Sequence, residues 1–103
     1  MPIEFPKGAS SASVRGRLSG RQQALYALKV REGQVITLEL NTTPAGGLEL
    51  KLHDPRGGET TLRQLNPHGW TAAAQQTGEY VITVIRTSDR PEASTYKLAV
   101  AVH

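Results

Sequence analysis

The amino-acid sequence predicts an all-β protein, an antiparallel β-sandwich of about eight short strands with a jelly-roll-like arrangement. Three observations support this fold class. Several short segments alternate apolar and polar residues, which is the pattern of a strand with one buried face. Gly, Pro and Asn separate these segments at intervals of roughly ten residues, which is typical of a sandwich. No window repeats apolar residues with the helical period over three turns, so no helix is predicted.

The first half of the chain contains the signals of four strands, at residues 3–6, 14–18, 25–30 and 34–40. Pro6 ends the first of them, which suits a short edge strand because proline cannot donate to a neighbouring strand. A polar turn around Gly20 leads into the third, where Tyr26 is in phase with the apolar Leu28. In the fourth, the aliphatic residues at every second position are expected to face inward.

The second half contains a clean strand at residues 48–53, a weaker one at 60–65, an irregular edge at 70–74, a central strand at 79–85 and a closing strand at 95–102. The cleanest alternation predicts that Leu48, Leu50 and Leu52 are buried. Glu49 and Lys51 are expected to be exposed. A shift of the strand register by one residue would expose all three leucines, so the pairing should be well defined.

The strand at residues 79–85 is the most β-like run in the chain. Tyr80, Ile82 and Val84 would share one face, with Val81, Thr83 and Ile85 on the other. A strand that is largely apolar on both faces belongs in the interior of a sheet. The polar residues 86–91 follow it, so this central strand should end in a charged loop.

Length and composition bound the architecture. A chain of 103 residues suits one domain, so residues 1–103 are predicted to form a single β-sandwich domain. A hydrophobic content of 38% with a net charge of +3 is typical of a chain that folds. The absence of cysteine excludes disulfides and cysteine-based metal sites. No apolar run approaches the ~20 residues that span a bilayer, so no membrane partner is predicted.

Residues that could carry catalysis or hold a metal are scattered along the sequence. His53, His68 and His103 lack the spacing of metal ligands. A triad could be named from Ser88, His68 and Asp54, but the nucleophile-elbow motif is absent. The basic residues are also scattered and the aromatic residues are few, so nucleic acid is not an expected partner. The sequence therefore predicts a binding protein, not an enzyme, without metal or other cofactor.

The aromatic residues have mainly structural interpretations. Trp70 is expected to cover one end of the sandwich, and Tyr80 and Tyr96 are expected in the core because they are in phase with aliphatic residues. Two interpretations of Tyr26 remain open. Its phase with Leu28 indicates the core, whereas its place just after the Gly20 turn would allow its hydroxyl to reach the rim.

A set of short motifs spans the whole chain. Residues 3–12 read I-E-F-P-K-G-A-S-S-A, and they are followed by Gly16, Gly20, Tyr26, Gly33-Gln34, Asp54-Pro55, His68-Gly69, Thr77-Gly78-Glu79-Tyr80 and Tyr96. In this combination the sequence resembles the bacterial periplasmic inhibitors of g-type lysozyme.

That resemblance implies an exported, periplasmic protein whose signal peptide is absent from the sequence. It also implies that the protein blocks a host g-type (goose-type) lysozyme with two surface regions, which would be residues 20–26 and 86–90 here. The partner-binding residues would be Tyr26, Arg86, Ser88, Asp89 and Arg90. An arginine suits a lysozyme cleft because a guanidinium can bind a carboxylate through two hydrogen bonds. Arg86 and Arg90 are therefore expected to be exposed at one end of the sandwich, near Tyr26.

An alternative shares part of the same evidence. The Gly-Gln turn before a strand and the G-x-Y start of a strand also resemble pre-peptidase C-terminal domains, which are small β-sandwiches. That resemblance implies a noncatalytic accessory or carbohydrate-binding domain of a secreted enzyme. Neither resemblance determines the oligomeric state.

Overall fold

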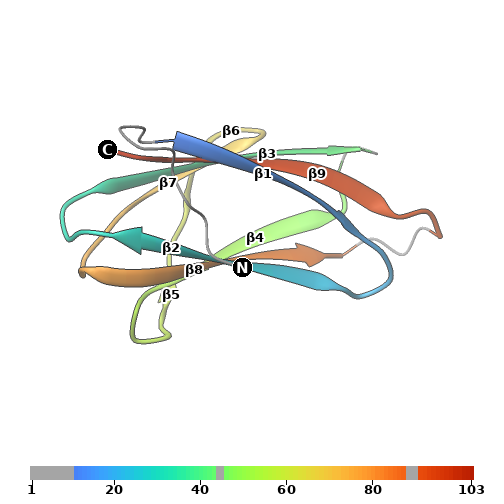
Figure 1. Ribbon diagram of the computed structural model, residues 1–103. Helices are drawn as coiled ribbons and strands as arrows, with labels where there is room; N and C mark the ends of the chain where they lie inside the picture. Colours follow the sequence, from blue (N-terminus) through green and yellow to red (C-terminus); the bar gives the residue numbers. More distant parts are fainter. Residues whose placement is uncertain (1–10, 44–45, 88–90) are drawn as a thin grey trace.

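The structure, a computed structural model, describes residues 11–43, 46–87 and 91–103. Within these residues nine strands form two antiparallel sheets that pack face to face (Figure 1). This part of the chain holds no helix, and so none that is long and apolar enough to cross a membrane. The predicted all-β sandwich is confirmed.

The larger sheet has the strand order β1 (Ser11–Leu18), β9 (Ser94–Val102), β3 (Val35–Thr43), β7 (Gly69–Ala73) and β6 (Arg63–Asn66). The smaller sheet has the order β2 (Gln23–Val30), β8 (Gly78–Arg86), β4 (Leu48–His53) and β5 (Glu59–Thr60). The prediction of one strand over residues 60–65 is wrong, because the chain leaves the smaller sheet after β5 and enters the larger sheet at β6. The strand predicted at residues 3–6 lies outside the described residues.

β8 pairs with β2 on one side and β4 on the other, so the prediction of a central strand is confirmed. Its residues Tyr80, Ile82 and Val84 are buried in the core between the sheets. Arg86 follows in the same phase and ends the strand. The alternation that buries three apolar side chains therefore also turns this arginine inward.

The first part of β4 lies at an open edge of the sandwich. Leu52 is fully buried as predicted, but Leu48 and Leu50 are only half-buried. Glu49 is exposed as predicted, whereas Lys51 is half-buried. The difference arises because β5 pairs with β4 only at its last two residues, which leaves the beginning of β4 without a covering strand in the described part of the chain.

Three connections between strands meet at one end of the sandwich, on the right of Figure 1. Their described parts are residues 19–22, 46–47, 87 and 91–93, which we call the loop end. Backbone hydrogen bonds join them: Arg86 N–H donates to the Gln22 carbonyl at 3.3 Å, and Thr87 N–H donates to the Gly47 carbonyl at 2.8 Å. The β1–β2 turn and the described start of the second region, Arg86 and Thr87, therefore meet at this end of the sandwich.

Candidate functional site

Arg86 lies beneath the loop end and does not project from it. The residue is only 5% exposed, so the expectation of an exposed Arg86 is wrong. Its guanidinium donates from Nε to Ser94 Oγ at 3.2 Å, from Nη1 to the Gly20 carbonyl at 3.0 Å and from Nη2 to the Glu92 carbonyl at 2.7 Å. A buried guanidinium is tolerated when its donors meet acceptors in this way. Arg86 thus joins the β1–β2 turn to the β8–β9 connection from the inside.

The β1–β2 turn is itself well defined. Gly20 has a positive φ of 58°, a conformation that glycine adopts without the steric cost of a Cβ atom. Gln22 closes the turn, because its N–H donates to the Ser19 carbonyl at 3.2 Å and its Oε1 accepts from Ser19 N–H at 3.0 Å. Arg21 and Gln22 are exposed at its tip. The loop end therefore presents a fixed turn with a basic side chain.

Tyr26 belongs to the core, which decides between the two interpretations of this residue. It is 6% exposed, and its hydroxyl is hydrogen-bonded to the hydroxyl of Tyr96. Tyr26 lies on β2 in the smaller sheet and Tyr96 on β9 in the larger sheet, so the two phenols link the sheets across the core. Burial, and then the hydrogen bond with Tyr26, raise the pKa of Tyr96 well above its ordinary value. The core positions predicted for Tyr80 and Tyr96 are confirmed.

Ser88, Asp89 and Arg90 lie outside the described residues, and their role in partner binding stays a prediction. The remaining two residues of the predicted set, Tyr26 and Arg86, lie on the paired strands β2 and β8 and are both buried; Tyr26 is opposite Ile82, four residues before Arg86. The phase of β8 was a signal for the burial of Arg86, since this residue continues the inward positions of the strand. No local pattern indicates its acceptors, which lie on other segments.

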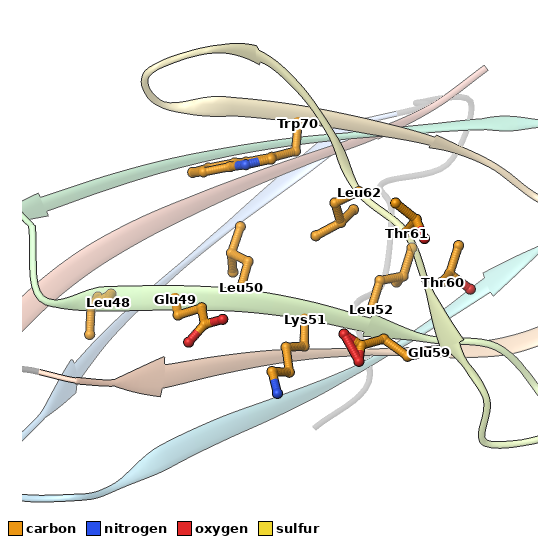
Figure 2. Close-up of a pocket in the computed structure, with 10 residues that line it drawn as sticks. All are labelled: Leu48, Glu49, Leu50, Lys51, Leu52, Glu59, Thr60, Thr61, Leu62 and Trp70. Atoms are coloured by element: carbon orange, nitrogen blue, oxygen red, sulfur yellow. The ribbon is translucent and has the colours of Figure 1, made fainter.

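A pocket opens at the edge of the sandwich, between β4 and β7. It has a volume of about 410 Å³, and its walls include Leu50, Leu62 and Trp70 (Figure 2). Trp70 is half-buried and extends from the larger sheet over Leu50 of β4. Trp70 was expected at an end of the sandwich, and no local pattern predicts this pocket, because Leu62 belongs to the segment that changes sheets.

Asp54, His53 and His68 have the chemistry for catalysis or metal binding and lie in the described part of the chain, whereas Ser88 lies outside it. Asp54 has a turn-forming role: its Oδ1 accepts hydrogen bonds from the N–H groups of Arg56 at 2.8 Å and Gly58 at 3.0 Å. His53 is half-buried on β4, and His68 is exposed. Among the described residues, no three His, Asp or Glu side chains gather into a group that could hold a metal ion.

Comparison with solved structures relates the whole sandwich to known proteins. PliG of Aeromonas hydrophila, described as a periplasmic lysozyme inhibitor of g-type lysozyme, superposes with a TM-score of 0.85 at 26% sequence identity. The match covers 99% of this chain and 94% of that protein. This chain has the fold of the PliG inhibitors. The resemblance identified in the sequence is thereby confirmed.

Two further structures define the range of the similarity. PliG of Salmonella Typhimurium matches with a TM-score of 0.82 at 18% identity, over 100% of this chain and 96% of that chain. The pre-peptidase C-terminal domain of a Bacillus anthracis collagenase matches with a TM-score of 0.67 at 20% identity, over 95% of this chain and 99% of that chain. The sequence matches no family model and no curated protein.

Proposed function

We propose that this protein is a periplasmic, noncatalytic inhibitor of a g-type lysozyme. The observation that carries the proposal is the full-length structural match to Aeromonas hydrophila PliG, at a TM-score of 0.85 and 26% identity. The match has no long insertion on either side, since it covers 99% of one chain and 94% of the other. Both its TM-score and its identity exceed those of the match to the collagenase pre-peptidase C-terminal domain, 0.67 and 20%, which favours the inhibitor function.

The proposed binding surface is the loop end. Arg21 is exposed at the tip of the β1–β2 turn, and the β8–β9 connection begins beside it. We place the direct contacts on Arg21 and on Ser88, Asp89 and Arg90. A muramidase cleft is built around catalytic carboxyl groups, and arginine is the side chain best suited to pair with a carboxylate.

Buried residues support this surface from behind. Arg86 ties the β1–β2 turn to the residues before β9, and the Tyr26–Tyr96 pair holds β2 against the larger sheet. Rigid loops lose less conformational entropy on binding than loose ones, and the affinity rises accordingly. In this arrangement Tyr26 and Arg86 contribute to inhibition without touching the enzyme.

The test is inhibition of lysis. The protein is titrated into a g-type lysozyme acting on bacterial cell walls, with a c-type lysozyme as the specificity control. Saturable inhibition of the g-type enzyme at near-equimolar protein is the expected result. Undiminished lysis by several g-type enzymes at a large excess of folded protein would overturn the proposal.

The alternative is an accessory domain of a secreted enzyme. It is favoured by the match to the collagenase pre-peptidase C-terminal domain, which covers 95% of this chain at a TM-score of 0.67. The two functions differ in the binding partner and in the effect on lysozyme activity. An accessory domain would bind an insoluble protein or polysaccharide in a pull-down assay and leave lysozyme activity unchanged.

A further inference from the structure

β4 has one edge that is mostly unpaired. Along its whole length it pairs with β8, but on its other side it pairs with β5 only at Leu52 and His53. Residues 48–51 therefore present unpaired backbone N–H and C=O groups along this edge, as far as the described residues show. Such a row of groups is complementary to one kind of partner, another extended strand.

The pocket of about 410 Å³ adjoins this same edge. Figure 2 shows Leu50 and Leu62 pointing into the space beneath the ring of Trp70. All three side chains are half-buried, so they form an apolar part of the pocket wall that water reaches, while Glu59, Thr60 and Thr61 also line the pocket. Filling it with an apolar side chain would remove that surface from water, which is favourable.

The charged residues beside the pocket indicate which residues should flank the apolar side chain of an added strand. Glu49 and Lys51 alternate with Leu50 and lie on the opposite face of β4 (Figure 2). In a strand added antiparallel to β4, the residue opposite Leu50 faces the pocket, and the residues before and after it face Lys51 and Glu49. Opposite charges stabilise such cross-strand pairs, so the added strand should read acidic, apolar, basic from its N-terminus.

We infer that residues 48–51 bind an extended segment of a partner protein by β-strand addition, with an apolar side chain seated between Trp70 and Leu50. The orientation is antiparallel, as in both strands that already pair with β4. Main-chain hydrogen bonds supply affinity in this mode and the side-chain pocket supplies specificity. Residues 48–51 follow Gly47 of the loop end and include none of the residues proposed to contact lysozyme.

A second copy of the chain fits the edge less well than a short segment. Antiparallel pairing of two β4 strands about Leu50 would place Leu48 of one copy opposite Leu52 of the other. The outer edge of Leu52 is already paired with Thr60. A short segment of another protein can end before it reaches β5, which a second sandwich cannot.

Trp70 is the single tryptophan of the chain, so its fluorescence reports on the pocket. The probe is the peptide formyl-Glu-Val-Lys-Thr-amide, in which Val would lie opposite Leu50 and Glu opposite Lys51, so that the peptide ends before β5. We expect a saturable change in Trp70 emission and shifts of the amide resonances of residues 48–51. A peptide with Glu and Lys exchanged should bind about tenfold more weakly. A peptide N-methylated at the groups that face β4 should not bind, because it cannot donate to the edge.

Two variants test whether the peptide binds in the pocket or elsewhere on the surface. Leu62→Glu places a charge in the pocket and should abolish peptide binding, whereas Leu65→Glu alters an exposed residue of β6 and should not. Equal binding of the N-methylated peptide, or amide shifts confined to other strands, would overturn the inference even if Leu62→Glu fails to fold. The absence of any response at millimolar peptide would do the same. A concentration-dependent dimer with shifts at residues 48–51 would assign the edge to a second copy instead.

Discussion

Gly16 of β1 lies opposite Tyr96 of β9, and the ring of Tyr96 occupies the space that a Cβ atom at position 16 would need. The two residues form one structural unit. Tyr96 passes over the glycine to meet Tyr26 of the other sheet, so the hydrogen bond between the phenols depends on the missing side chain.

Gly16→Ala should therefore destabilise the protein by about 1 to 3 kcal/mol, the usual cost of overpacking a core. This is the reverse of the stabilisation that alanine usually gives over glycine within a strand. Urea unfolding monitored by Trp70 fluorescence measures the change, with Ser13→Ala on the exposed face of the same strand as the control. In a Tyr96→Leu background the Gly16→Ala substitution should be nearly neutral. An equal cost in both backgrounds would contradict the steric explanation.

Arg86→Met keeps much of the side-chain volume but removes the hydrogen bonds to Gly20, Glu92 and Ser94. We expect a loss of about 2 to 4 kcal/mol in the free energy of unfolding, because the buried Ser94 hydroxyl and two partly buried carbonyls lose their charged donor. Arg21→Met, at an exposed position in the same turn, should change stability by less than about 0.5 kcal/mol. Thermal unfolding followed by circular dichroism compares the stability of the Arg86→Met and Arg21→Met variants. Similar small effects for both would show that the buried hydrogen bonds contribute little.

The raised pKa of Tyr96 has a consequence at high pH. Below the ordinary tyrosine pKa of about 10 the residue is neutral in both the folded and the unfolded chain, so its contribution to stability is fully present. Above that value the unfolded chain releases a proton that the folded chain retains, and stability falls by up to about 1.4 kcal/mol per pH unit.

The measurement is the free energy of unfolding between pH 8 and 11 for the wild type and Tyr96→Phe. The wild type should lose stability more steeply above pH ~10, and the difference between the two curves isolates Tyr96 from the other titrating groups. Parallel curves would contradict the proposed retention of the proton.

Arg90→Ala should weaken inhibition of a g-type lysozyme without affecting stability. If Arg90 is an anchor in the enzyme cleft, its truncation should cost about 2 kcal/mol, or roughly thirtyfold in the inhibition constant. Lys29→Ala, an exposed cation on β2, is the charge-matched control and should inhibit like the wild type. Full inhibition by Arg90→Ala would remove this residue from the site and leave the proposed function standing.

The alternation of apolar and polar residues along the sequence predicted most strands of the sandwich. The alternation at residues 48–53 and the two apolar faces of residues 79–85 identified β4 and β8, because both signals are contained within a single strand. The change of sheet between β5 and β6 has no such signal, since β5 is two residues long and its place depends on β4.

The candidate site was harder to predict because it depends on residues far apart in the sequence. Arg86 was expected to be exposed because it begins the charged loop after the central strand and because an arginine suits a lysozyme cleft. One of its acceptors, the carbonyl of Gly20, is 66 residues away. The hydroxyl of Tyr26 finds its partner 70 residues away. The phase of each strand gave the direction of these side chains, but only the folded chain shows what they meet.

The strand order also bears on how the chain folds. β9, at the C-terminal end of the chain, lies between β1 and β3 and pairs with both. Until β9 is in place, the first strand has no neighbour in its sheet, and the larger sheet cannot assemble around its middle. Pairing between residues as distant as Ser11 and Ala101 is typical of slow folding, on the order of milliseconds to seconds. The native larger sheet therefore forms only once residues 94–102 are available to pair with both neighbours.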